Sequence, residues 1–323
     1  MSGTGEQRKR PRSRPAPGLQ HGKYGFIVTF LLLPVGLYVL YSVSPYLQAF
    51  FYSLTDWGGF TPDYEVIGFE NYTDLFSDDQ FLVALGNNAI LMLIVPAATV
   101  ILGLFFASML NVGRHGKTGI TGVRGSGVYK IVYFFPQVLS IAIVGVLFKY
   151  VFAPTNSGGI LNNILVGIGL DSLAVPWLGD PRFAFWCVVL VMIWSFVGFY
   201  VVLFSAAMQS IPKDVYEAAL LDGANRWTTF WKLTLPLVWD TVQVGWVYMV
   251  IQAIDGFALV NIMLGGGGGP NQSGDVLGVM LYRSLFDDGK AGFASAIGVI
   301  LLLMTLFISV VFMRLARRER VEY

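Results

Sequence analysis

Polar side chains that could bind a ligand lie within a long apolar stretch of this chain. Tyr248, Gln252 and Asp255 are separated by four and three residues, so a helix would carry all three on one face. An ionisable side chain inside a membrane costs roughly 2.5 to 3.5 kcal/mol unless it faces protein or water. Carboxylates and amides pair well with the hydroxyls of a sugar, so this face is a candidate sugar-binding surface.

A second apolar stretch supplies aromatic side chains for the same purpose. Its segment IWSFVGFY runs from Ile193 to Tyr200, which places Phe196 and Phe199 at a depth similar to that of Gln252. Aromatic rings stack on the C–H faces of sugar rings. Aromatic clusters on membrane helices also serve packing or an interface belt, and both interpretations stay open.

The sequence offers little for catalysis. The two histidines, His21 and His115, lie in basic segments, and we find no cluster of metal ligands and no nucleophilic triad. The segment NVGRHGKT, Asn111 to Thr118, approaches a phosphate-binding loop, but it lacks the first glycine and follows an apolar span instead of a strand. We therefore expect neither an enzyme nor a cofactor, metal or ATP bound by this chain.

Composition places these residues in a membrane protein. The 323 residues are 55% hydrophobic and only 13% charged, against roughly 25% charged in soluble domains. Six apolar stretches reach the length of about 20 helical residues that crosses a bilayer, and none alternates as a strand would. The predicted fold is all-α with six spans, near residues 25–48, 88–111, 129–152, 184–208, 238–263 and 292–314.

The distribution of charge predicts the orientation of these spans. Seventeen of the 21 Lys and Arg residues fall in the two tails and in every second connection, and basic residues concentrate in cytoplasmic loops. Both termini are therefore predicted to be cytoplasmic. We expect a disordered basic tail at 1–23 that faces lipid and not nucleic acid, a membrane domain at 24–316 and a cytoplasmic end at 317–323.

The connection between the fourth and fifth spans has a distinct pattern. It reads EAALLDGANRWTTFWKLTLP, from Glu217 to Pro236. Its first residues are strong helix formers, Gly223 allows the positive φ that stops a helix, and Pro236 is predicted to allow no continuation. The pattern predicts two short cytoplasmic helices joined by a glycine turn.

This connection resembles the EAA loop of the permease subunits of ATP-binding-cassette (ABC) importers. Segments IGFENYTDLF, GGGGGPNQSGDVLGVMLYRSLF and AGFASAIGV are similar to those of the sugar branch of that family. The resemblance implies a type I importer fold and a pore shared with a second, different permease subunit. It also implies a separate ATPase dimer that uses ATP and Mg, and an extracytoplasmic solute-binding protein.

The resemblance also assigns site residues. The residues expected to couple to the ATPase are Glu217, Ala218, Ala219, Asp222, Gly223, Ala224 and Pro236. Those expected along the substrate pathway are Ser195, Phe196, Phe199, Tyr248, Gln252, Asp255 and Gly256. Those expected to contact the binding protein are Gly267, Gly268, Pro270 and Asn271, in a loop that is predicted to be flexible and that could also be a mere linker.

The resemblance implies uptake of a mono- or oligosaccharide, with an N-acetylglucosamine or chitobiose system suspected. Two other classes stay open. An ion-coupled carrier would transport without a nucleotide-binding partner, and a membrane scaffold would tolerate changes in the connection between the fourth and fifth spans.

Overall fold

The computed structural model describes residues 21–111, 115–116, 119–120, 125–254 and 256–315. The chain divides into two units, Met1–Gln48 and Ala49–Tyr323. The first described element is α1 (His21–Tyr38), followed by a π turn (Val39–Val43) and α2 (Ser44–Tyr52). Residues Ile27–Tyr52 form an apolar span of 26 residues, in agreement with the first predicted span.

Two helices follow the first outer loop. They are α3 (Glu70–Ser77) and α4 (Asp79–Asn111), and the 33 residues of α4 extend the predicted second span at its beginning. The buried Asn71 side chain fixes the loop before α3, because its amide donates to the carbonyl oxygens of Ser53 (2.9 Å) and Thr55 (2.8 Å). A short hairpin of β1 (His115–Gly116) and β2 (Gly119–Ile120) follows α4.

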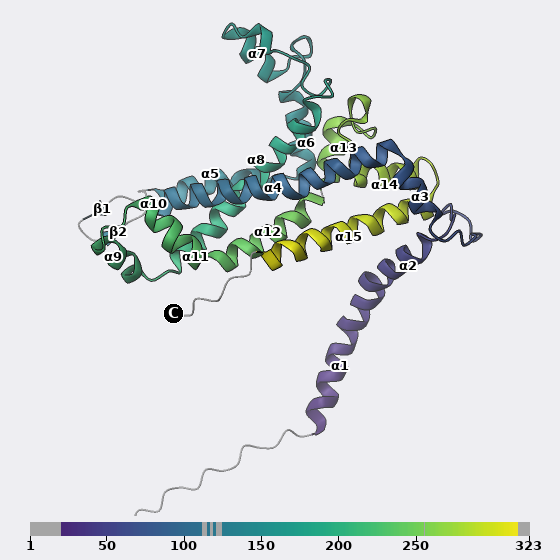
Figure 1. The fold of residues 1–323 in the computed structure, drawn as a ribbon, viewed down its shortest axis with the longest axis horizontal. Helices are drawn as coiled ribbons and strands as arrows, with labels where there is room; N and C mark the ends of the chain where they lie inside the picture. The colour runs from purple at the N-terminus through teal and green to yellow at the C-terminus, as the bar shows by residue number, and fades with distance from the viewer. Residues whose placement is uncertain (1–20, 112–114, 117–118, 121–124, 255, 316–323) are drawn as a thin grey trace, which may run out of the picture. The chain divides into compact units, whose positions relative to one another are not determined.

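The third span is sharply bent, whereas the sequence predicted one stretch from 129 to 152. Helices α5 (Ser126–Val138) and α6 (Ile141–Val151) meet at 94°. The backbone of Leu139 and Ser140 between them is not helical, with ψ angles of 139° and 137°. Figure 1 shows α6 turning away from α5 toward α7 (Ile160–Gly167), which lies between the 3-10 turns Thr155–Ser157 and Asp171–Leu173.

The connection after α8 (Ala184–Gln209) is helical almost throughout. It contains α9 (Lys213–Leu221), α10 (Arg226–Thr229), a π turn (Phe230–Thr234) and α11 (Leu235–Leu237). The segment Arg226–Leu237 then meets α12 (Trp239–Ile254) at 72°.

The fifth span is interrupted as well, which corrects the continuous helix predicted over 238–263. α12 ends at Ile254, and α13 (Phe257–Leu264) begins after Gly256. Asp255 lies outside the described residues, so only Tyr248 and Gln252 can be assigned to a shared face of α12.

The last part of the chain contains a 3-10 turn (Pro270–Gln272), α14 (Leu277–Phe286) and α15 (Ala291–Leu315). Within the described part of the chain, four helices are long and apolar enough to cross a membrane. The count rises to six if α5 with α6 forms one span and Arg226–Leu237 with α12 forms another. The prediction of an all-α polytopic membrane protein is confirmed, and the six predicted spans agree with the higher of these two counts.

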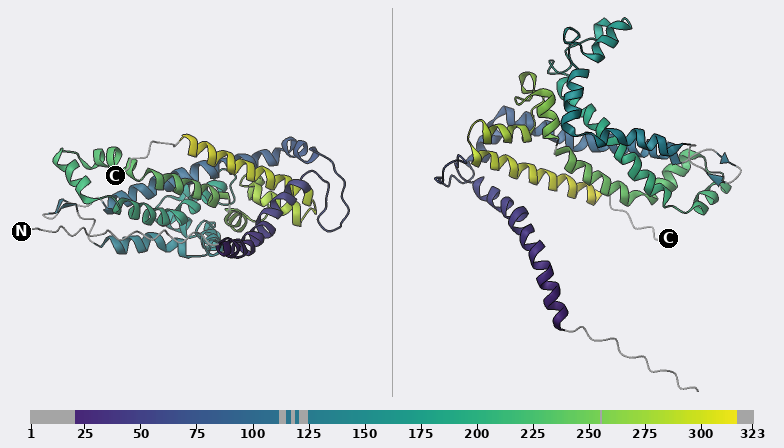
Figure 2. Two further views of the ribbon diagram at one scale, coloured as in Figure 1. Left: turned by 90° about the horizontal axis from the view of Figure 1, so that it is seen from below. Right: turned by 180° about the vertical axis from the view of Figure 1, so that it is seen from behind.

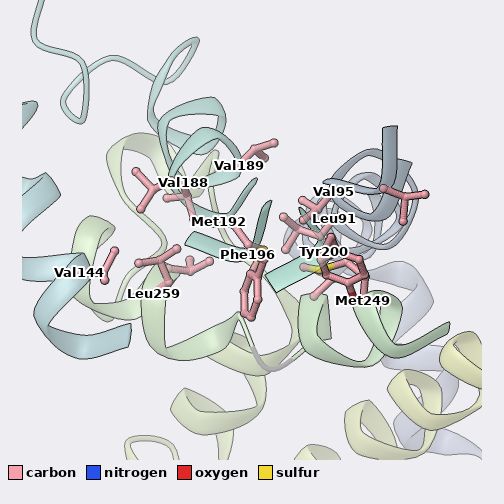
Figure 3. Close-up of a cluster of buried hydrophobic side chains, with 14 of the residues drawn as sticks. Leu91, Val95, Val144, Val188, Val189, Met192, Phe196, Tyr200, Met249 and Leu259 are labelled. Carbon is pink, nitrogen blue, oxygen red and sulfur yellow. The ribbon is translucent and has the colours of Figure 1, made fainter. Parts of the chain in front are cut away.

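The core forms where α4, α8 and α12 pack together. Tyr200 of α8 is fully buried, and its hydroxyl donates to the carbonyl oxygen of Gly245 in α12 at 2.9 Å. A β-carbon at Gly103 of α4 would lie 2.7 Å from Tyr200 Cβ, so the missing side chain lets α4 approach α8. Figure 3 shows Tyr200 with Val95 of α4 and Met249 of α12 around it.

The connections lie at opposite ends of the long helices. Figures 1 and 2 show α9 and α10 at one end of the bundle formed by α4, α8, α12 and α15, with α3 and α14 at the other end. The segment with the EAA pattern and the glycine-rich loop before α14 are therefore separated by the length of a span.

Candidate functional site

A cavity of about 210 Å³ opens where the two interrupted spans meet α8. Four of the predicted pathway residues line it: Ser195 and Phe196 from α8, Gln252 from α12, and Gly256 at the start of α13. The structure therefore brings together residues that the sequence placed on separate spans.

The breaks in the helices create the space. The third span contributes Pro136, Gln137 and Leu139 to the cavity at the point where α5 ends. Non-helical backbone at membrane depth is tolerated where it lines a cavity or is buried in protein. Interrupted helices of this kind commonly form substrate sites in transporters.

Gly256 has a steric role at this cavity. A β-carbon there would lie 2.2 Å from Met192 Cε and 2.9 Å from the carbonyl oxygen of Ala253. The methionine side chain is flexible, but the backbone carbonyl cannot move without disturbing the end of α12. A larger residue at this position would therefore narrow the cavity and shift the break between α12 and α13.

The polar groups of the cavity can make hydrogen bonds to a neutral ligand. The side-chain oxygen of Gln137 is buried and accepts no hydrogen bond from the described residues. Ser195 donates its hydroxyl to the carbonyl oxygen of Val191 at 2.8 Å, which leaves its own oxygen available as an acceptor. With Gln252 and the ring of Phe196, the cavity offers amide, hydroxyl and aromatic groups.

Gln137 was missed by reasoning from the sequence. The signal was present, since Pro136 and Gln137 interrupt an otherwise apolar stretch. A proline bends or ends a helix and a buried amide in a membrane usually has a partner, so this dipeptide could have been selected.

Two predicted pathway residues lie outside this cavity. The rings of Phe199 and Tyr248 pack against each other with centroids 5.7 Å apart, and neither lines the cavity. Trp194 likewise packs edge-on against Phe148 at 5.0 Å. These contacts fit the packing interpretation of the aromatic cluster. Asp255, which was also predicted to line the pathway, lies outside the described residues.

The predicted glycine turn is present after α9. Gly223 has a φ of 76°. Its amide donates to the carbonyl oxygen of Leu220 at 3.0 Å, and the amide of Ala224 donates to the carbonyl oxygen of Ala219 at 2.9 Å. These two bonds form a Schellman motif, which requires a left-handed residue and favours glycine. The next helix begins at Asn225, whose side chain accepts from the amide of Thr228 at 2.8 Å.

One face of α9 is anchored and the other is free. Val215 and Tyr216 pack against the buried core, whereas Glu217, Ala218 and Leu221 are exposed and Leu221 is 89% accessible. Asp222 and Gly223 are exposed at the turn, and Ala219 and Ala224 are half-buried. The exposed Leu221 lies between the acidic residues Glu217 and Asp222. The free face can therefore offer both an apolar and a charged contact to another protein.

Pro236 does not end the second helix, contrary to the sequence prediction. It lies within α11, and the break comes after Leu237 at Val238, which has a φ of −98° and a ψ of 9°. The preceding π turn explains this, because the amide of Leu235 donates to the carbonyl oxygen of Phe230 and the register is already shifted before the proline.

The segment that follows the five glycines is bonded to the beginning of α4, a set of contacts that the sequence did not predict. The Asn87 amide donates to the carbonyl oxygens of Ser273 (2.9 Å) and Asp275 (2.8 Å), and Asn88 accepts from the Leu277 amide at 2.7 Å. Asp275 is buried and pairs with Arg283 at 2.6 Å. The beginning of α4 therefore holds the loop in place.

The same loop presents only some of the predicted contact residues. Gly267 and Asn271 are exposed and Pro270 is half-buried. Gly268 is buried, and a β-carbon there would lie 2.7 Å from Asp275 Cβ. Of the predicted contact residues, Gly267 and Asn271 are therefore the ones exposed on the surface of the loop.

Comparisons with known proteins agree with this geometry. Residues 118–321 match the family described as the binding-protein-dependent transport system inner membrane component. The chain is 40% identical over 306 residues to the diacetylchitobiose uptake system permease protein NgcF of Streptomyces coelicolor, covering 94% of this chain and 85% of that protein. It is 32% identical to the multiple sugar-binding transport system permease protein MsmF of Streptococcus mutans, covering 91% and 96%.

A solved structure has the same fold. A chain of a bacterial ABC transporter involved in the import of the acidic polysaccharide alginate superposes with a TM-score of 0.76. The two chains are 24% identical, and the match covers 93% of this chain and 98% of the other. The two chains therefore share the same overall fold.

Proposed function

This chain belongs to the family of binding-protein-dependent transport system inner membrane components, and on that basis we propose that it forms half of the pore of an ABC sugar importer. The observation that carries the proposal is the cavity where α8 meets the broken third and fifth spans. Its amides, hydroxyl and aromatic ring match the hydroxyls and C–H faces of a sugar.

The proposed substrate is a mono- or oligosaccharide, with N-acetylglucosamine or diacetylchitobiose as the first candidates. The relative of Streptomyces coelicolor bears the name of a diacetylchitobiose permease. The side chains of Gln137 and Gln252 suit an acetamido group as well as hydroxyls, because an amide offers both a donor and an acceptor. We add Gln137 to the residues proposed for the substrate pathway.

We propose that energy enters through α9. Its free face, with Glu217, Ala218 and Leu221, would seat in a separate ATPase subunit that binds ATP and Mg. The anchored face carries Val215 and Tyr216, which contact the core. A rigid displacement of α9 would thus reach the spans that line the cavity, and the site would change its exposure between the two sides.

The proposed assembly contains this chain, a second and different permease, an ATPase dimer and an extracytoplasmic solute-binding protein. The binding protein would contact Gly267 and Asn271 in the loop between α13 and α14, and Figure 1 shows α14 at the end of the bundle opposite to α9. A structural neighbour was solved as an alginate transporter in complex with an alginate-bound periplasmic protein. In this orientation both termini and α9 face the cytoplasm, as the basic residues predict.

The comparisons give no support to the alternatives of an ion-coupled carrier or a membrane scaffold. Reconstitution in proteoliposomes tests the proposal. The complete transporter should accumulate labelled diacetylchitobiose or N-acetylglucosamine only when ATP, Mg and the binding protein are present. Uptake that persists without the ATPase would refute the proposed energy source, and uptake of neither sugar by an active transporter would refute only the proposed substrate.

A further inference from the structure

A groove lies between the end of α4 and the helical segment that follows the glycine turn. Its volume is about 350 Å³, and it is separate from the cavity described above. One wall is formed by Ile101, Phe105 and Met109 of α4, and the other by Arg226, Trp227 and Trp231. The proposed transport of sugar uses none of these side chains.

The walls of the groove are apolar and accessible. Phe105 is 53% exposed and Met109 is 57% exposed. Both lie in the last two turns of α4, which is long and apolar enough to span a membrane. Trp227 is 71% exposed, and its ring contacts that of Trp231 edge-on with centroids 5.5 Å apart. Tryptophan is enriched where a membrane protein crosses from hydrocarbon to headgroups. The two tryptophans beside the end of α4 are the composition expected at the boundary of a bilayer.

The groove has a positive charge at its rim. Arg226 lines it and is exposed, and it forms no ion pair with any described residue. The membrane leaflet on the cytoplasmic side carries anionic lipids, and each basic residue near its surface adds about 1 kcal/mol of attraction to them. An acyl chain beside a phosphate-bearing headgroup has the complementary chemistry.

We propose that this groove binds an anionic phospholipid of the leaflet on the side of α9. One acyl chain lies against the wall formed by α4, and the phosphate lies beside Arg226. The lipid bridges α4 to the segment after the glycine turn, so the composition of that leaflet affects the ease with which the segment moves. The proposal depends on the position of the groove in the membrane and not on the sugar that is carried.

Quenching of tryptophan fluorescence tests the proposal. The complete transporter in detergent is titrated with phosphatidylglycerol or phosphatidylcholine that carries brominated acyl chains, which quench tryptophan on contact. The same titration of the double variant Trp227→Phe/Trp231→Phe gives the quenching of all other tryptophans. The saturable quenching that this variant lacks is the signal from the groove. We expect half-saturation at a concentration about fivefold lower for phosphatidylglycerol than for phosphatidylcholine.

Matched variants identify the source of that preference. Arg226→Gln should reduce the preference to less than twofold, whereas Arg314→Gln, an exposed arginine at the end of α15 that lines neither cavity, should leave it unchanged. Equal half-saturation of the two lipids in the unmodified transporter overturns the proposal. The absence of any quenching from Trp227 and Trp231 also overturns it, because another subunit would then fill the groove.

Discussion

The backbones of Gly198 and Tyr133 lie in direct contact, which joins α8 to α5 just before the bend of the third span. A β-carbon at Gly198 would lie 1.7 Å from the carbonyl oxygen of Tyr133. Close approach of this kind requires a residue without a side chain. The contact sets the position of Gln137, one turn further along α5, relative to the cavity.

Replacing Gly198 should therefore separate α5 from α8. We expect Gly198→Ala to destabilise the protein by about 1–3 kcal/mol, the usual cost of overpacking, and to abolish most sugar uptake. Thermal unfolding of the purified transporter and uptake into proteoliposomes measure the two effects. Gly86→Ala is the control, because a β-carbon at Gly86 of α4 meets nothing within 4 Å. Equal effects of the two substitutions would contradict the proposed contact.

The cavity should respond to the loss of its amides. We expect Gln137→Leu and Gln252→Leu each to raise the KM of sugar uptake about tenfold, since a lost hydrogen bond costs about 1–1.5 kcal/mol. Basal ATP hydrolysis should stay the same, because neither residue lies near α9. Tyr248→Phe removes a hydroxyl outside the cavity and should change KM by less than about twofold. A larger effect of Tyr248→Phe than of Gln252→Leu would place the pathway elsewhere.

The turn after α9 should tolerate only residues that adopt a positive φ. Gly223→Asn should keep most of the uptake, because asparagine enters the left-handed region readily, whereas Gly223→Val should lose it. Both variants should still insert in the membrane. Co-purification of the ATPase measures docking, and uptake measures coupling. If Gly223→Val transported as well as Gly223→Asn, the geometry of this turn would have no part in coupling.

The free face of α9 should depend on its charge and its apolar contact. We expect Glu217→Lys and Leu221→Asp each to reduce co-purification of the ATPase at least about tenfold, with normal amounts of the chain in the membrane. Asp240→Asn alters an exposed acid at the start of α12 and serves as the control. Full co-purification of both variants would exclude this face as the docking site.

The buried pair of Asp275 and Arg283 should hold the glycine-rich loop. Removing one partner of a fully buried ion pair costs about 3–5 kcal/mol. Arg283 is partly exposed, so Asp275→Ala should cost no more than about 3 kcal/mol and should loosen the loop. Stimulation of ATP hydrolysis by the binding protein measures the consequence and should fall strongly. The exposed Asp287, which ends α14, provides the control Asp287→Ala. Normal stimulation in Asp275→Ala would mean that the order of the loop does not matter for docking.

The class of the protein, its apolar stretches of membrane-spanning length and the turn at Gly223 could all be predicted from the sequence. These features follow from local properties, because the length of an apolar stretch decides whether it crosses a bilayer and a helix stop depends on the φ angle of one residue. The resemblance of residues 217–236 to an EAA loop could be recognised for the same reason, since the pattern lies within 20 consecutive residues.

The positions of the bends in the spans and the meeting of polar groups from different helices became evident only from the three-dimensional packing. Hydropathy is the same for a straight and a broken apolar stretch, so it predicted neither the break at Leu139 nor the one after Ile254, and only Pro136 pointed to the first. The buried side of the glycine-rich loop likewise depends on Asn87, which lies 186 residues before Ser273 along the chain. Contacts over such distances arise from the packing of whole helices, and no local pattern of residues contains them.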